Sequence, residues 1–209
     1  MDSDLKKENS SALFLILATS LVVSALFQFD LKVVSGLMDA AVIGGSGVML
    51  SAVLVMIANL IPHSIKHKLV FTRFKNELAG CRVDSLCRRD TRIDYELAQA
   101  RWPNVFEEGI DPDTRNSRWY HQIYKPVRNE PSVLQAHRSF FLYRDAFSGL
   151  LLIFLATLSL SLFGKTLFHF TPNPMIFAVQ GTLAVFALVA ARISGSRFVV
   201  NAVAAAEQD

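Results

Sequence analysis

The amino-acid sequence predicts an all-α polytopic membrane protein with four transmembrane helices, paired as two hairpins on either side of a helical cytoplasmic domain. Two observations lead to this fold class. The chain is unusually apolar, with 52% hydrophobic residues among 209 and a mean hydropathy of +0.34. The apolar residues are concentrated in four blocks that contain no Asp, Glu, Lys or Arg, namely residues 11–29, 40–61, 146–163 and 175–191.

Each block is close to the roughly 20 residues that a helix needs to cross the hydrocarbon core of a bilayer. None of them has the polar stripe of a helix on the surface of a water-soluble protein. The fourth block is the shortest, and Arg192 can extend it because a long basic side chain reaches from the end of a span to the interface. Phe27, Gln28 and Phe29 make a poor signal-peptidase site, so we expect the first block to remain as a span.

The distribution of basic residues predicts the topology. Most of the 21 Lys and Arg residues lie between positions 63 and 145, whereas the two short hairpin loops contain only Lys32 and Lys165. The positive-inside rule then places both termini and the middle segment in the cytoplasm. The expected organisation is a tail and first hairpin (1–62), a basic cytoplasmic domain (63–145), a second hairpin (146–195) and a cytoplasmic tail (196–209).

The cytoplasmic domain is expected to be mostly helical. Residues 63–86 have apolar side chains at roughly helical spacing. Thr91 and Asp94 have the spacing of a capping box for a short helix. Residues 104–116 are expected to form a loop because they include a glycine and an Asp-Pro-Asp sequence. A proline is favourable in the first turn of a helix, so a further helix is expected to begin near Pro131 and to continue into the third span.

A group of basic side chains follows the second apolar block and is the first candidate binding site. Such residues anchor a span at the interface, and each can contribute about 1 kcal/mol of attraction to an anionic leaflet. They can equally bind a small anionic ligand. The group consists of His63, Lys66, His67, Lys68, Arg73 and Lys75.

Small residues recur every three or four positions in the second and fourth blocks. Small side chains let membrane helices approach closely, either within one subunit or between subunits, and we expect a homo-oligomer. The residues concerned are Gly44, Gly47, Ser51, Gly181 and Ala184. The blocks contain no Asp, Glu or His of the kind that a proton-coupled transporter carries within the membrane.

The sequence supports a catalytic site or a metal site less than it supports the basic group and the packing residues. The segment RNSRWYH resembles the Arg-x5-His pattern of HEPN ribonucleases, with Arg115 and His121 as the matching pair. That resemblance implies a nuclease in which these residues stabilise and protonate groups at a phosphate, and His137 is a further candidate. The pattern lies between two prolines rather than in the long helix typical of that family, so a non-enzymatic role is favoured.

Zinc is considered because two histidines four residues apart share a helical face and two cysteines follow. The residues are His63, His67, Cys81 and Cys87, and the cysteine spacing is too loose for a zinc motif. We predict no metal and no cofactor, and reduced cysteines in the cytoplasm. The middle segment is basic but contains no nucleic-acid-binding motif, so nucleic acid is not an expected partner.

The layout of AVIGGSGVMLSAVLVMIANL, then residues 63–145, then GLLLIFLATLSLSLF resembles the small multi-span membrane effectors and sensors of bacterial anti-phage defence systems. The resemblance lies in the arrangement and carries over no functional residue. It implies a homo-oligomer whose cytoplasmic domain receives a ligand or a soluble protein, and whose spans sense or permeabilise the membrane. The alternatives are a membrane anchor or scaffold for a cytoplasmic enzyme and, third, a membrane-bound nuclease-like enzyme.

Overall fold

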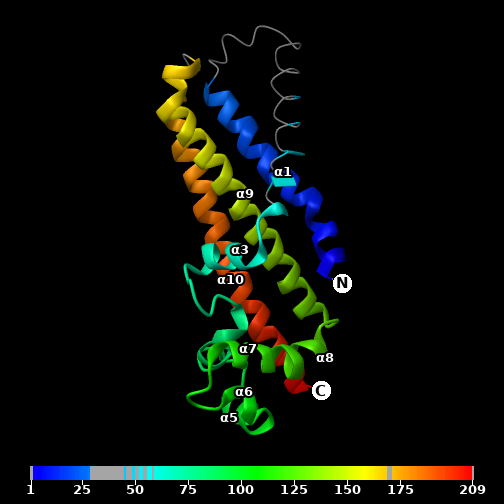
Figure 1. Ribbon diagram of the computed structural model, residues 1–209. Coiled ribbons are helices and arrows are strands. Elements are labelled where there is room, and N and C mark those ends of the chain that lie inside the picture. Colours follow the sequence, from blue (N-terminus) through cyan, green and yellow to red (C-terminus); the bar gives the residue numbers. More distant parts are fainter. Residues whose placement is uncertain are drawn as a thin grey trace. The chain divides into compact units, whose positions relative to one another are not determined.

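The computed structural model describes residues 2–28, 59–168 and 171–208, together with a few single positions between 45 and 57. Every regular element within these residues is a helix (Figure 1). The chain divides into two units, which are described separately. The first consists of Met1–Pro62 and Leu142–Val189, and the second of His63–Phe141 and Ala190–Asp209.

Three helices of the described chain are long and apolar enough to cross a membrane: α1 (Asp2–Gln28), α9 (Pro131–Phe168) and α10 (Pro174–Gln208). They contain the predicted first, third and fourth spans. More than half of the predicted second span, residues 40–61, lies outside the described residues. The helix expected from Pro131 into the third span is confirmed, because α9 is continuous over its whole length.

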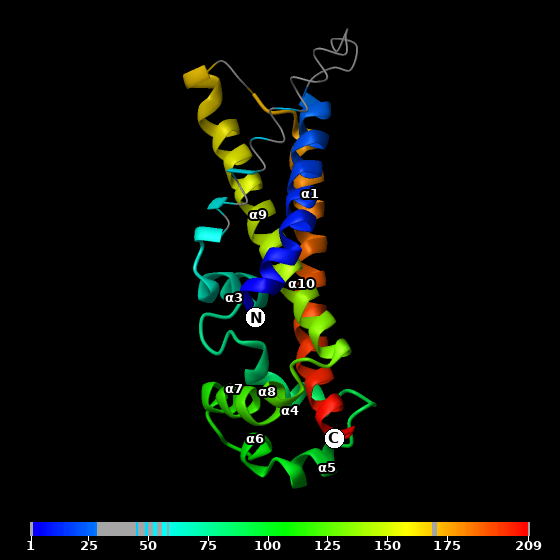
Figure 2. The same cartoon turned by 90° about the vertical axis from the view of Figure 1, so that its right-hand side faces the viewer.

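In the first unit, α1 packs against both α9 and α10 (Figure 2). A Cβ atom added to Gly149 of α9 would lie 2.8 Å from Cδ2 of Leu17, so the glycine permits a close approach of α1. Gln180 of α10 is fully buried, and its Nε2 donates to Oγ of Ser24 at 3.0 Å. Hydrogen bonds between side chains of this kind add to van der Waals contact in holding apolar helices together.

Asn173 connects the end of α1 to the beginning of α10. Its Oδ1 accepts a hydrogen bond from the backbone N–H of Met175 at 3.0 Å, which is the geometry of a helix N-cap. Its Nδ2 donates to the carbonyl of Phe27 at 2.9 Å, and its backbone N–H donates to Oε1 of Gln28 at 2.8 Å. One side chain and one backbone amide therefore join the two helix ends.

The second unit contains short helices followed by the first turns of α9 and the last turns of α10. The short helices are α3 (His63–Phe71), η1 (Ala79–Arg82), α4 (Val83–Cys87), α5 (Tyr95–Arg101), α6 (Pro103–Phe106), α7 (Pro112–Trp119), the π-helix η2 (Tyr120–Tyr124) and α8 (Lys125–Val127). Aromatic rings around Phe198 form part of its core. The ring of His137 stacks on Phe198 with centroids 4.3 Å apart, and Trp119 and Tyr124 meet the same ring edge-on at 5.4 and 5.0 Å.

Several predicted boundaries are wrong. The N-cap of α5 is Asp94 itself, whose side chain accepts from the backbone N–H of Leu97, so no capping box begins at Thr91. Residues 104–116, expected to be a loop, include most of α6 and the first half of α7, because Pro103 and Pro112 each occupy an early helical position.

The predicted tail, residues 196–209, is helical as far as Gln208. No proline or glycine follows Gly195, and Val199 and Val203 are fully buried, so packing of an apolar face continues the helix. The boundary between the two units follows Phe141, and it does not test the predicted end of the cytoplasmic domain at residue 145. Arg144 and Asp145 belong to the first unit, where they form a buried ion pair with Nε and Oδ1 3.0 Å apart.

Candidate anion-binding site

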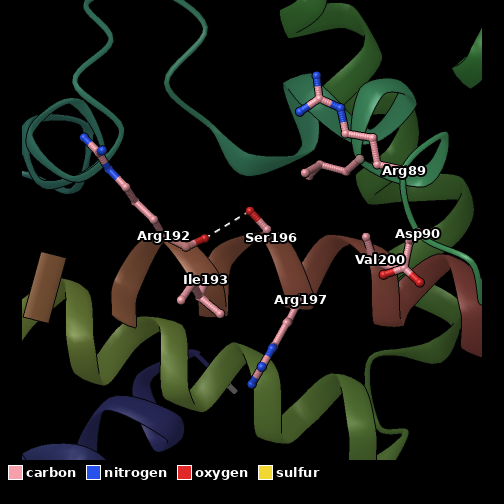
Figure 3. A pocket seen from close by; sticks show the side chains of 8 residues that line it. Arg89, Asp90, Arg192, Ile193, Ser196, Arg197 and Val200 are labelled. Carbon is pink, nitrogen blue, oxygen red and sulfur yellow. Dashed lines mark hydrogen bonds between the residues drawn. The ribbon is translucent and has the colours of Figure 1, made fainter. Parts of the chain in front are cut away.

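A hollow of about 370 Å³ lies in the second unit, along the last part of α10. Its α10 residues recur every three or four positions and therefore share one face of the helix. The remaining wall comes from residues 86–90, at and just after the end of α4 (Figure 3). The lining residues of this α10 hollow are Leu86, Arg89, Asp90, Arg192, Ile193, Ser196, Arg197 and Val200.

The charge on the hollow is predominantly positive. Asp90 is its one carboxylate, and Arg92 binds it with two hydrogen bonds of 3.0 Å, from Nε to Oδ1 and from Nη2 to Oδ2. These bonds lower the pKa of Asp90, so it stays ionised and paired. Within the described chain, the side chains of Arg89 and Arg197 have no carboxylate partner. Figure 3 shows that Arg197 extends from α10 away from Arg89 and Arg192.

Arg192 holds the end of α3. Its Nε donates to the carbonyl oxygen of Val70 at 2.7 Å, and its Nη2 donates to Oγ1 of Thr72 at 2.9 Å. A cation is favourable there because the last carbonyls of a helix lack partners and carry partial negative charge. The C-terminal end of α3 forms a Schellman motif. The N–H of Arg73 donates to the carbonyl of Lys68 at 3.2 Å, and Thr72 has a left-handed φ of +50°.

Arg82 is the most unusual cation of the second unit. Its guanidinium carbon lies 4.2 Å from the centre of the Phe71 ring, within the range of a cation–π contact. Its Nε and Nη2 are buried and have no hydrogen-bond partner in the part of the chain that the structure describes. Burial lowers the pKa of Arg82, and the nearby charges of Arg73 and Arg192 lower it further.

Arg73, Arg82 and Arg192 thus form an arginine cluster of like charges, and Arg192 belongs to both this cluster and the hollow. Unpartnered buried N–H groups and uncompensated positive charge are each unfavourable. An anion placed among these guanidinium groups would relieve both through charge-assisted hydrogen bonds. The arrangement is therefore suited to binding a phosphate or a similar oxyanion.

The basic patch predicted from the sequence is not a single exposed surface. Lys66 is buried, with 1% of its surface exposed, and His67 is half-buried with its ring 5.5 Å from that of Phe140. One side of α3 is packed against the core of the unit, which explains both positions. Lys68 is half-buried, whereas His63, Arg73 and Lys75 are exposed. Arg73 is the member that joins the arginine cluster.

The catalytic candidates have separate contacts that support the fold. Arg115 donates from Nε to the carbonyl of Val105 at 3.1 Å and from Nη2 to that of Glu107 at 2.9 Å, which stabilises the end of α6. His137 is buried, and its Nδ1 lies 3.1 Å from the hydroxyl of Tyr124. His121 is exposed and meets the ring of Tyr120 edge-on.

The cysteines are buried free thiols. Burial raises the pKa of both Cys81 and Cys87 to about 12, and Sγ of Cys81 lies 3.5 Å from Oδ1 of Asp113. A protonated thiol is a poor nucleophile and a poor metal ligand. Within the described residues, no three His, Cys, Asp or Glu side chains form a group that could hold a metal ion.

Of the predicted packing residues, Gly44, Gly47 and Ser51 lie outside the described residues. Gly181 is half-buried, and a Cβ atom built on it would meet only Phe154, at 3.9 Å, within that part of the chain. Ala184, one turn further along α10, is buried.

Four of the arginines described above were not predicted from the sequence: Arg82 of the arginine cluster, and Arg89, Arg192 and Arg197 of the hollow. The available signal was the spacing of residues 192, 193, 196, 197 and 200, which predicts one basic and apolar helical face beyond the fourth block. Comparisons of this chain with protein-family models, with curated proteins and with solved structures find no match.

Proposed function

We propose that this chain is a four-span protein of a bacterial inner membrane that acts as a homo-oligomeric sensor or effector of a defence or stress system and responds to a small anion. Both termini and residues 63–145 face the cytoplasm, and the α10 hollow is the receiving site. The partners are then membrane lipids, other copies of the chain and the anion.

The observation that carries this proposal is the composition of α10. The helix begins with an uncharged run that ends at Ala191, and its next turns carry the arginine-lined face of the hollow. At 1.5 Å per residue, the uncharged run is about 27 Å long, close to the thickness of a bilayer core. Because one continuous helix carries both features, a ligand that shifts the basic half has a direct mechanical route to the apolar half.

The size and lining of the hollow favour a small ligand. Pockets for small molecules occupy roughly 300–1,000 Å³, and a hollow of about 370 Å³ is at the lower end of that range. The hollow has no aromatic ring on which a nucleobase could stack. Inorganic pyrophosphate therefore serves as a suitable probe, since it carries several anionic oxygens in a small volume.

The test is the thermal unfolding of the full-length protein in detergent with and without pyrophosphate, followed by the fluorescence of the buried Trp119 and the half-buried Trp102. A ligand at about 100 times its Kd stabilises the folded state by about 2.7 kcal/mol. Arg89→Gln removes an exposed arginine without a partner in the described chain, so the variant is expected to fold. Arg128→Gln, on an exposed residue that does not line the hollow, is the matched control.

We expect pyrophosphate to raise the Tm of the wild type and of Arg128→Gln by several degrees, and to raise that of Arg89→Gln much less. Sodium chloride at the same ionic strength is expected to have little effect. An equal rise in all three proteins, or no rise in the wild type, would contradict an anion site at the α10 hollow.

A further inference from the structure

The segment between α3 and η1 presents an exposed aromatic side chain that no part of the anion site explains. Phe74 is 88% exposed, the highest value among the exposed large apolar side chains of the described chain. Moving an apolar ring out of water is favourable, so a side chain this exposed is a candidate to contact an apolar partner. We refer to residues 72–76, Thr-Arg-Phe-Lys-Asn, as the Phe74 loop.

The shape of the Phe74 loop is set by its two ends. Thr72 has φ +50° and Asn76 has φ +55°, both in the left-handed region that non-glycine residues seldom adopt. The Schellman hydrogen bond of Arg73 and the contact of Arg192 with Oγ1 of Thr72 fix the first end. Two left-handed residues enclose the three residues at the tip, so the exposure of Phe74 follows from a defined backbone rather than from a frayed helix end.

The two charged residues next to Phe74 in the chain are both basic. Arg73 and Lys75 are exposed and have no carboxylate partner in the described residues. No Asp or Glu occurs from His63 to Asn76. Ile65 of α3 adds a second exposed apolar side chain, 46% exposed. Glu77 follows the loop, but the two charges that flank Phe74 directly are positive, and an aromatic side chain between two cations is typical of a segment that binds an anionic bilayer surface.

The position of the loop in the chain favours lipid over a soluble partner. Only Pro62 separates α3 from the uncharged block that ends at residue 61. The nine residues of α3 span about 14 Å, so a chain that leaves the bilayer at residue 61 reaches the Phe74 loop within one short helix. We propose that the Phe74 loop binds the cytoplasmic leaflet, with Phe74 inserted at the acyl boundary and Arg73 and Lys75 at the phosphates of anionic phospholipids.

This inference rests on the membrane embedding in the proposed function but not on its anion site. It also gives Arg192 a further role. Because Arg192 binds Thr72 at the first end of the loop and lines the α10 hollow, the lipid-bound loop and the hollow share one side chain.

The test places an environment-sensitive NBD fluorophore on Phe74→Cys in the full-length protein reconstituted into vesicles. Cys81 and Cys87 are buried and protonated at neutral pH, so a maleimide reacts at the new cysteine. Leu97→Cys, on α5 and 51% exposed, receives the same label as a control. The vesicles consist of phosphatidylcholine with or without phosphatidylglycerol, and some carry doxyl quenchers on the acyl chains.

We expect the emission of the label at position 74 to shift to the blue and to be quenched by doxyl lipid, more strongly when phosphatidylglycerol is present. The label at position 97 should show neither effect. Adding Arg73→Gln and Lys75→Gln should remove the dependence on phosphatidylglycerol. A label at position 74 that behaves like that at position 97 would overturn the proposal, as would a blue shift without quenching by lipid, which would indicate a protein contact instead.

Alkaline carbonate extraction of the same vesicles separates the two proposals. Protein that remains in the vesicles while the label at position 74 stays in water leaves the membrane embedding intact and rejects the lipid-binding loop. Protein that is extracted contradicts the embedding and the loop together.

Discussion

Buried ionisable groups distinguish this chain at the scale of the residue. Arg144 and Asp145 form an ion pair with only 1% and 8% of their side chains exposed, directly before the third uncharged block. Separating such charges from water is costly, and pairing offsets part of that cost. Arg82 has a different environment, because it lies near two cations and has no partner for two of its nitrogens within the described chain. An anion close to Arg82 would therefore gain two buried N–H donors and offset the positive charge.

The two thiols give a prediction about reactivity and pH. Burial raises the pKa of Cys81 and Cys87 from 9.0 to about 12, so the folded protein holds these protons more tightly than the unfolded chain. Their contribution to stability is complete below pH 9 and is lost as the pH rises from about 9 towards 12, because the unfolded chain releases its thiol protons first.

We expect Ellman's reagent at pH 8 to react with neither thiol of the native protein and with both after denaturation. We also expect the unfolding midpoint to fall more steeply above pH 9 in the wild type than in the Cys81→Ala/Cys87→Ala variant. Rapid reaction of the native protein would contradict the burial of these thiols.

Helix packing at the scale of the element gives a second prediction, with a control in the same unit. A side chain at Gly149 would meet the buried Leu17 at 2.8 Å, whereas one at Gly181 would meet Phe154 at 3.9 Å, an ordinary contact distance. Gly149→Leu should separate α1 from α9 and destabilise the protein by about 1–3 kcal/mol, in the range of overpacked cores. Gly181→Leu should cost much less.

The measurement is the unfolding midpoint of both variants in the same detergent. Equal losses would contradict the α1–α9 contact.

The sequence predicted elements well where a single physical requirement dominates. The absence of charge over a membrane-length run was sufficient to predict α1, α9 and α10 as helices long and apolar enough to cross a membrane. The absence of charge did not predict where a helix ends when that end depends on packing. α10 continues through residues 196–208 because its apolar face is buried, and that burial requires neighbours that are distant in the sequence. Local capping rules identified Asp94 as part of a cap but assigned the wrong residue as its first position.

At the scale of the whole molecule, the site depends on contacts between residues far apart in the sequence, which explains why the sequence did not predict it. Arg89 follows α4 and Arg192 lies on α10, and only the fold of the second unit brings both to one hollow. The same fold buries Lys66, which the sequence grouped with exposed basic residues. A count of basic residues near a span thus predicts attraction to anions, but the geometry of binding comes from tertiary contacts.

The proposed function requires that α10 crosses the bilayer and continues into water as the same helix. Site-directed spin labelling of single cysteines at Val185, Val189 and Arg197 tests it in vesicles, because all three positions are exposed on α10. Power saturation then compares the access of apolar oxygen and of polar nickel-EDDA to each nitroxide. We predict that the labels at 185 and 189 are accessible to oxygen and protected from nickel-EDDA, and that the label at 197 shows the reverse. Access of nickel-EDDA to all three positions would contradict a membrane span in α10 and, with it, the proposed route from the anion site to the membrane.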